Sequence, residues 1–180
     1  MTIKAWNYLK EYEEEKEYII AAIKDVLDSG VLILGDKVKQ FEREFADYCG
    51  VRFGVGVNSG TDALFLGLKA LDIRPGDEVI TVANTAVPTV SAIVSAGAIP
   101  RFVDIDPDTY LMDISALKKA VTGKTKCILP VHLYGQCVNM DDVKSIAASY
   151  DLKVLEDCAQ CHGATFRGEK AGSLSDIAAF

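Results

Sequence analysis

The sequence predicts an α/β domain built on a mostly parallel sheet, preceded by a helical arm. After about residue 50, short apolar runs typical of strands alternate with longer segments whose apolar residues have helical spacing. This alternation predicts parallel βαβ units with helices on both faces of one sheet. The first 50 residues show only helical spacing. We therefore expect an N-terminal arm over residues 1–50 and the α/β domain over residues 51–180.

Apolar spacing and end signals place each element. In the arm, a first helix should end at Ser29-Gly30 and a second at Gly50. Further helices are expected over 61–71, 86–96, 113–121 and 141–150, the third of them capped by Asp113. Strands are expected over 53–57, 78–82, 99–103, 125–129 and 152–155. The helix over 61–71 is apolar on all sides, which predicts a buried helix.

Composition excludes several classes of function. The 180 residues include 19 basic and 26 acidic side chains, a net charge of −7, with no basic stripe. This balance argues against a nucleic-acid or anionic-membrane partner. No apolar run approaches 18 residues, so we expect no membrane-spanning helix. The polar N-terminus and the odd number of cysteines, five, favour a cytoplasmic protein with reduced thiols.

A candidate anion site lies at the start of the helix over 61–71. Gly60 allows a ligand close to the backbone, and Thr61 offers a hydroxyl. Free N–H groups and the helix dipole at such a helix start favour phosphate. The same residues also fit a simple capping box, with Ser59 as the cap and Asp62 three residues later. The sequence leaves both interpretations open.

A second candidate group follows the strand over 152–155. Asp157 should reach the ligand edge of the sheet, where its carboxylate could hold a cationic ring nitrogen. Gln160, three residues later, could donate to a phenolic oxygen. An acidic turn with a helix cap explains the same residues equally well.

The stretch Cys158-Ala159-Gln160-Cys161-His162 matches the haem-attachment pattern C-x-x-C-H. A zinc site here would need a further ligand from Cys127, Cys137 or His132. Short motifs of this kind recur by chance, and the segment follows a strand of an α/β sheet. We expect no metal and interpret His132 and His162 either as packed side chains or as residues that support those in contact with a ligand.

Seven segments together resemble the DegT/DnrJ/EryC1/StrS family of pyridoxal-phosphate (PLP) sugar aminotransferases. They run through the whole chain in the family's order, but they match only the front half of a family member. The segments are 32–35 (LILG), 41–46 (FEREFA), 59–64 (SGTDAL), 75–80 (PGDEVI), 102–106 (FVDID), 130–135 (PVHLYG) and 156–164 (EDCAQCHGA).

The resemblance implies the large domain of a fold-type I PLP-dependent transferase, working as a homodimer with active sites at the subunit interface. The implied cofactor contacts are Gly60, Thr61 and Asp62 at the phosphate, Asp157 at the pyridine nitrogen, Gln160 at the 3-hydroxyl side and Ala86 at the ring face. Many family members have an aromatic residue at this last position, where Ala86 offers only a methyl group.

The resemblance assigns no catalytic residue within this chain. In the family, the segment matching 172–176 leads into an apolar strand, a serine and then the Schiff-base lysine. That lysine and the small C-terminal domain are expected beyond Phe180. We therefore expect the chain alone to be inactive.

The implied reaction is transfer of an amino group, typically from glutamate, to a nucleotide-linked keto-sugar in the cytoplasm. A separate C-terminal half is a further candidate partner. Two alternatives stay open: a fragment of a related PLP-dependent sugar dehydratase, with histidine in place of the lysine, and a non-catalytic dimerising remnant.

Overall fold

A computed structural model describes residues 7–180 of the protein. These residues divide into two compact units, one up to Glu44 and one over 45–180. The chain begins with α1 (Tyr8–Ser29), followed by α2 (Asp36–Cys49), within which the unit boundary falls. Each of these helices is followed by a glycine in the left-handed conformation, Gly30 with φ 68° and Gly50 with φ 77°. Both predicted ends are confirmed.

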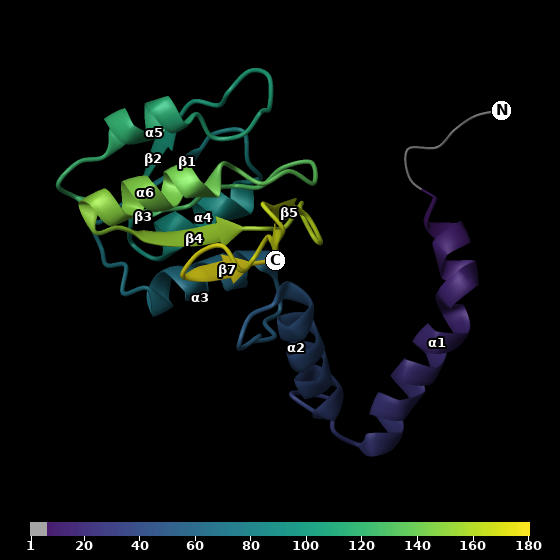
Figure 1. Cartoon of the computed structure of the whole chain (residues 1–180). Coiled ribbons are helices and arrows are strands. Elements are labelled where there is room, and N and C mark those ends of the chain that lie inside the picture. Colours follow the sequence, from purple (N-terminus) through teal and green to yellow (C-terminus); the bar gives the residue numbers. More distant parts are fainter. Residues whose placement is uncertain (1–6) are drawn as a thin grey trace. The chain divides into compact units, whose positions relative to one another are not determined.

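The second unit is built on a five-stranded parallel sheet (Figure 1). Its strands are β1 (Glu78–Val82), β2 (Ile99–Val103), β3 (Thr125–Ile128), β4 (Lys153–Asp157) and β7 (Ile177–Ala179). They lie in the order β2-β1-β3-β4-β7, and every neighbouring pair is parallel. The predicted parallel sheet is confirmed, and the bounds of β1 and β2 match the prediction.

Helices cover both faces of this sheet, as predicted. On one face lie α3 (Gly60–Ala70) and α4 (Val87–Ser95), and on the other lie α5 (Ile114–Ala120) and α6 (Met140–Tyr150). Figure 1 shows α3 beside β7 and α6 beside β3 and β4. The core between these layers consists of fully buried aliphatic side chains such as Leu68, Ile80, Ile93, Ile128 and Leu155.

The expected strand over 53–57 is wrong. These residues have no regular secondary structure, and Phe53 and Val55 are 73% and 81% exposed. The sheet ends at β7 on the side of α3, and no strand in the described part of the chain pairs with 53–57. A strand pattern without a neighbouring ladder leaves its backbone groups unpaired and does not form a strand.

Two further details differ from the prediction. Helix α3 is not buried on all sides, because Leu66 is 48% exposed while Leu64 and Leu68 are buried. Strand β4 runs two residues further than expected, so that Glu156 and Asp157 belong to the strand.

A short hairpin after β4 was not anticipated. Its strands β5 (Thr165–Phe166) and β6 (Glu169–Lys170) are joined by Arg167 and Gly168, both with positive φ, as a type I′ hairpin turn requires. None of the described helices is both long enough and apolar enough to cross a membrane.

Candidate functional site

A cavity of about 170 Å³ lies at the carboxyl end of the sheet, next to the starts of α3 and α4. Four predicted site residues, from three segments distant in the sequence, line it together. The lining residues are Gly60, Thr61, Leu64, Ala86, Pro88, Thr89, Asp157, Ala159, Ala179 and Phe180. This edge is where open α/β sheets bind ligands, because parallel strands all end there.

The start of α3 forms one wall of the cavity. Ser59 caps the helix by accepting a hydrogen bond on Oγ from the amide of Asp62, at 3.1 Å. Because first-turn amides have no acceptor within their own helix, those of Gly60 and Thr61 remain for an anion. The cap and the anion site, open alternatives in the sequence, therefore fit one geometry.

Asp62 itself is directed elsewhere. Its carboxylate accepts a hydrogen bond from Asn58 Nδ2, and Asp62 is not among the residues that line the cavity. Its place in the phosphate site stays a prediction.

Asp157 ends β4 with its carboxylate at the cavity, and the residue is only 5% exposed. Thr89 Oγ1 donates a hydrogen bond to Oδ2 at 2.8 Å, and the amide of Ala159 donates to Oδ1 at 3.2 Å. An ionised carboxylate has about four acceptor positions, so these two donors leave room for a ligand. No lysine, arginine or histidine of the described residues forms an ion pair with Asp157. The site thus suits a cationic N–H donor.

The other predicted contacts differ in position. Ala86 is the N-cap residue of α4 and lines the cavity. Gln160 is exposed and does not line the cavity. Its backbone carbonyl accepts a hydrogen bond from the amide of Gly135 at 3.0 Å. Its cofactor contact stays a prediction.

Thr89 was missed by the sequence reasoning. It lies in the first turn of α4 and is 1% exposed, and its hydroxyl contacts Asp157. The available signal was the pair of threonines at 85 and 89, four residues apart at a helix start that follows a strand.

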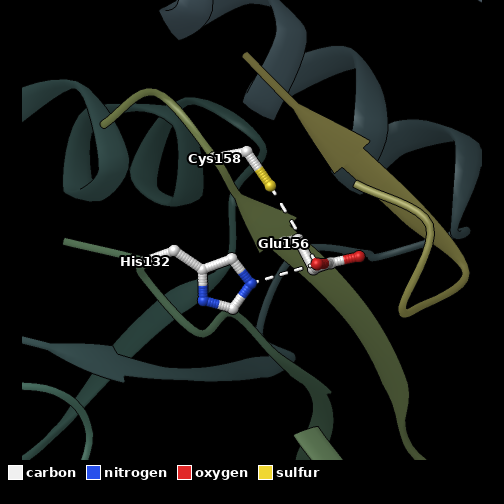
Figure 2. Close-up of side chains that lie close together, drawn as sticks. All are labelled: His132, Glu156 and Cys158. Atoms are coloured by element: carbon white, nitrogen blue, oxygen red, sulfur yellow. Dashed lines mark hydrogen bonds and ion pairs between the residues drawn. The ribbon is translucent and has the colours of Figure 1, made fainter. Parts of the chain in front are cut away.

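Next to the cavity, Glu156 forms a buried cluster with His132 and Cys158 (Figure 2). Five donors converge on its carboxylate: His132 Nε2 at 3.0 Å, the amides of Gly172 at 3.1 Å and Leu174 at 3.0 Å, Ser175 Oγ at 2.9 Å and the Cys158 thiol at 4.0 Å. His132 Nδ1 accepts from the amide of Val138 at 3.1 Å, so the proton of a neutral ring lies on Nε2. Because the lone pairs of Glu156 and of His132 Nδ1 accept these hydrogen bonds, the cluster holds the backbone in place rather than offering ligands to a cation.

The environment of Glu156 favours its charged form. Burial by itself would raise the pKa of Glu156, but the hydrogen bonds from His132, the Gly172 amide and Ser175 outweigh burial and lower that pKa.

Cys127 and Cys158 are poor nucleophiles. A hydrogen bond with Cys161, burial and the nearby Glu156 charge raise the pKa of Cys158, and burial raises the pKa of Cys127 to about 12. The thiolate is the reactive form, so these thiols are protonated and inert at neutral pH. His162 is exposed and packs its ring on Phe180, with centroids 5.1 Å apart. Of the C-x-x-C-H residues, Cys158 and Cys161 thus contact each other in a buried cluster, while His162 packs on Phe180.

A second hollow, of about 600 Å³, lies between α5 and α6. Its lining comes from two helix surfaces and includes Lys118, Lys119 and Asp142, all exposed. No strand end contributes to it, so we assign it no chemistry.

Comparison with known proteins gives consistent matches. The chain is 51% identical over 180 residues to a Micromonospora megalomicea protein named dTDP-3-amino-3,4,6-trideoxy-alpha-D-glucose transaminase, covering 100% of this chain and 48% of that protein. It thus spans about half the length of the curated relatives that it matches.

Solved structures agree. Streptomyces venezuelae DesV, in complex with a ketimine intermediate, superposes with a TM-score of 0.90 at 43% identity, over 92% of this chain and 45% of that one. Bacillus subtilis NtdA with bound cofactor PMP (pyridoxamine phosphate) gives 0.84 at 41% identity, over 88% and 37%. A family profile matches residues 13–180. The chain belongs to the DegT/DnrJ/EryC1/StrS aminotransferase family.

Proposed function

We propose that this chain is part of a PLP-dependent aminotransferase and supplies its phosphate site and its ring-nitrogen carboxylate. The observation that carries this proposal is the single cavity shared by Gly60, Thr61, Ala86 and Asp157, although up to 97 residues separate them in the sequence (157 minus 60). The substrates are a nucleotide-linked keto-sugar and an amino acid such as glutamate. The relative named as a dTDP-sugar transaminase supports this substrate class.

The lining residues fit the cofactor at each of its ends. The amides of Gly60 and Thr61, at the positive end of α3, would bind the phosphate. Asp157 would accept a hydrogen bond from the protonated pyridine nitrogen, and Ala86 would lie at the ring face. When bound, the cofactor supplies an electron sink for the negative charge formed on the substrate carbon.

The contribution of Asp157 is electrostatic. Its carboxylate is nearly buried, where attraction to a cation is stronger than in water, so it would hold a proton on the ring nitrogen of a bound cofactor. Thr89 and the Ala159 amide hold the carboxylate in place. No lysine lines the cavity in the described part of the chain. We therefore propose that the proton-transferring lysine comes from a further segment. From the family resemblance, we also propose that the working enzyme is a cytoplasmic homodimer.

The test is binding of pyridoxamine phosphate, which needs no lysine, to the 180-residue chain. Asp157→Asn removes the charge but keeps the shape, and should weaken binding by about tenfold to a hundredfold, the range expected for one charge-assisted hydrogen bond. The measurement is a fluorescence titration of the wild-type chain and the variant.

Asp104→Asn is the matched control. Asp104 directly follows β2 at the same end of the sheet, but it is exposed and lies outside the cavity. Its replacement should leave the affinity unchanged. Equal affinity of the wild-type chain and Asp157→Asn would overturn the assigned role of the carboxylate.

A further inference from the structure

We propose that Thr89 is a positioning residue that aims the Asp157 carboxylate into the cavity, through a hydrogen-bond chain that begins at Thr85. This inference rests on the proposed function for the identity of the ligand, but its geometry stands on contacts within the chain. It adds a residue to the site for which no motif gave a role.

The chain of contacts is short, and it runs from the half-buried Thr85 to two buried side chains. Thr85 Oγ1 lies 2.7 Å from Thr89 Oγ1, which lies 2.8 Å from Asp157 Oδ2. Thr89 is 1% exposed and Asp157 is 5% exposed. Thr85 precedes α4 and Thr89 lies in its first turn, so the four-residue spacing brings the two hydroxyls together at the helix start.

The direction of each hydrogen bond follows from the number of protons. An ionised carboxylate only accepts, and each hydroxyl has one proton to donate. Thr89 must therefore donate to Asp157, and Thr85 must donate to Thr89. Both contacts thus point the same way, toward the carboxylate, and each strengthens the other.

This arrangement holds both oxygens of Asp157 from different elements. Oδ2 accepts from Thr89 on α4, and Oδ1 accepts from the Ala159 amide just after β4. With both oxygens held, rotation of the carboxylate is restricted before any ligand arrives. Binding then avoids the entropy loss of ordering this side chain, which is the benefit of preorganisation.

Loss of the Thr89 hydroxyl would have two opposing effects. It would leave a lone pair of Oδ2 without its donor, and that lone pair could then accept from a ring N–H. It would also free Oδ2 to turn away from the cavity. We expect the second effect to dominate, because binding at this site needs the correct direction as well as the charge.

The test compares Thr89→Val with Thr89→Ser in the 180-residue chain, using pyridoxamine phosphate as the probe. Valine keeps the shape of threonine but lacks the hydroxyl, and should weaken binding about tenfold, because a carboxylate that can turn away makes a poorer charge-assisted hydrogen bond to the ligand. Serine keeps the hydroxyl and should recover most of the lost affinity.

Thr81→Val is the matched control for a purely structural effect. Thr81 is also fully buried, and its hydroxyl donates to the carbonyl of Leu129 at 2.9 Å, away from the cavity lining. Both valine variants should lower the melting temperature to a similar extent, but only Thr89→Val should lower the affinity. Equal losses of affinity in the two variants would overturn the proposal.

A double-mutant cycle shows whether Thr89 acts through Asp157. In the Asp157→Asn background, Thr89→Val should change the affinity less than about twofold, because coupled sites are not additive. Additive effects would contradict a positioning role. If Asp157→Asn leaves binding unchanged, the proposed function fails; if only the cycle is additive, this inference fails alone.

An NMR measurement without ligand tests the positioning role independently of whether the chain binds pyridoxamine phosphate. The Ala159 amide, bonded to Asp157 Oδ1, should change its NMR shift in Thr89→Val and keep it in Thr81→Val. An unchanged Ala159 signal in Thr89→Val would overturn the positioning role.

Discussion

Glu156 and Asp157 are neighbouring carboxylates of β4 with different roles, because successive side chains of a strand point to opposite faces. Asp157 reaches the cavity and keeps acceptor positions for a ligand. Glu156 is engaged by His132 and by the backbone of 172–174, which leads to β7. Asp157 is thus suited to binding a ligand, whereas Glu156 holds the segment leading to β7, which forms a wall of the cavity.

Replacement of Glu156 by glutamine should destabilise the chain strongly at neutral pH. The amide NH₂ of glutamine would face N–H donors that now point at a carboxylate, leaving buried groups unpaired. We expect a loss of about 3 kcal/mol in the free energy of unfolding. Urea denaturation at pH 7 measures it, with Glu169→Gln, an exposed residue of β6, as the control.

The same variant should show a characteristic pH dependence. Because the folded pKa of Glu156 is lowered, its contribution to stability is complete above the unfolded pKa of about 4.3 and is lost as the pH falls through the folded value. The gap between the wild-type chain and Glu156→Gln should therefore narrow below about pH 4. A gap that stays constant down to pH 3 would show that the charge of Glu156 does not stabilise the fold.

At this scale the sequence predicted part of the site. Gly60, Thr61 and Asp157 were predictable because each follows a strand, or an apolar run resembling one, in an alternating α/β pattern, and Ala86 was identified by resemblance. Thr89 was not predicted, because the pair of threonines at 85 and 89 is too common a pattern to indicate a site. Its role depends on a contact between residues 68 positions apart.

At the scale of elements, local signals predicted the helices and most strands correctly. Helix ends at Gly30 and Gly50 and the cap at Asp113 depend on neighbouring residues alone. The expected strand over 53–57 failed because strand formation depends on a neighbouring strand, which local sequence does not reveal. The two-residue strands of the β5–β6 hairpin are too short to show a pattern.

The close packing of α3 against the sheet limits the size of the side chain at Gly67. A Cβ at Gly67 would lie 3.0 Å from Leu155 Cδ1 and 3.6 Å from Ile177 Cγ2, on β4 and β7. A valine there would overpack this interface, and Gly67→Val should lower stability by about 2 kcal/mol despite its better helix propensity. Thermal or urea unfolding measures the change.

The matched control introduces the same residue on the exposed side of the same helix. Leu66 is 48% exposed, so Leu66→Val should cost no more than about 0.5 kcal/mol. Similar losses in the two variants would contradict a close contact between α3 and the β4–β7 pair.

At the scale of the whole molecule, three observations point to a ligand site at the carboxyl edge of the sheet: the parallel strands, the family and one shared cavity. The sheet brings the ends of β1 and β4 to one edge, and α3 and α4 begin there. The chain matches about half the length of its curated relatives, so the complete reaction is a proposal for the complete enzyme. For this part of the enzyme we propose only that it holds the cofactor between the start of α3 and Asp157.

A crystal structure of the 180-residue chain with pyridoxamine phosphate tests that claim most directly. We predict the phosphate at the amides of Gly60 and Thr61, and the ring nitrogen about 3 Å from the Asp157 carboxylate, an ordinary hydrogen-bond distance. A phosphate bound elsewhere, or a ring nitrogen directed away from Asp157, would contradict it.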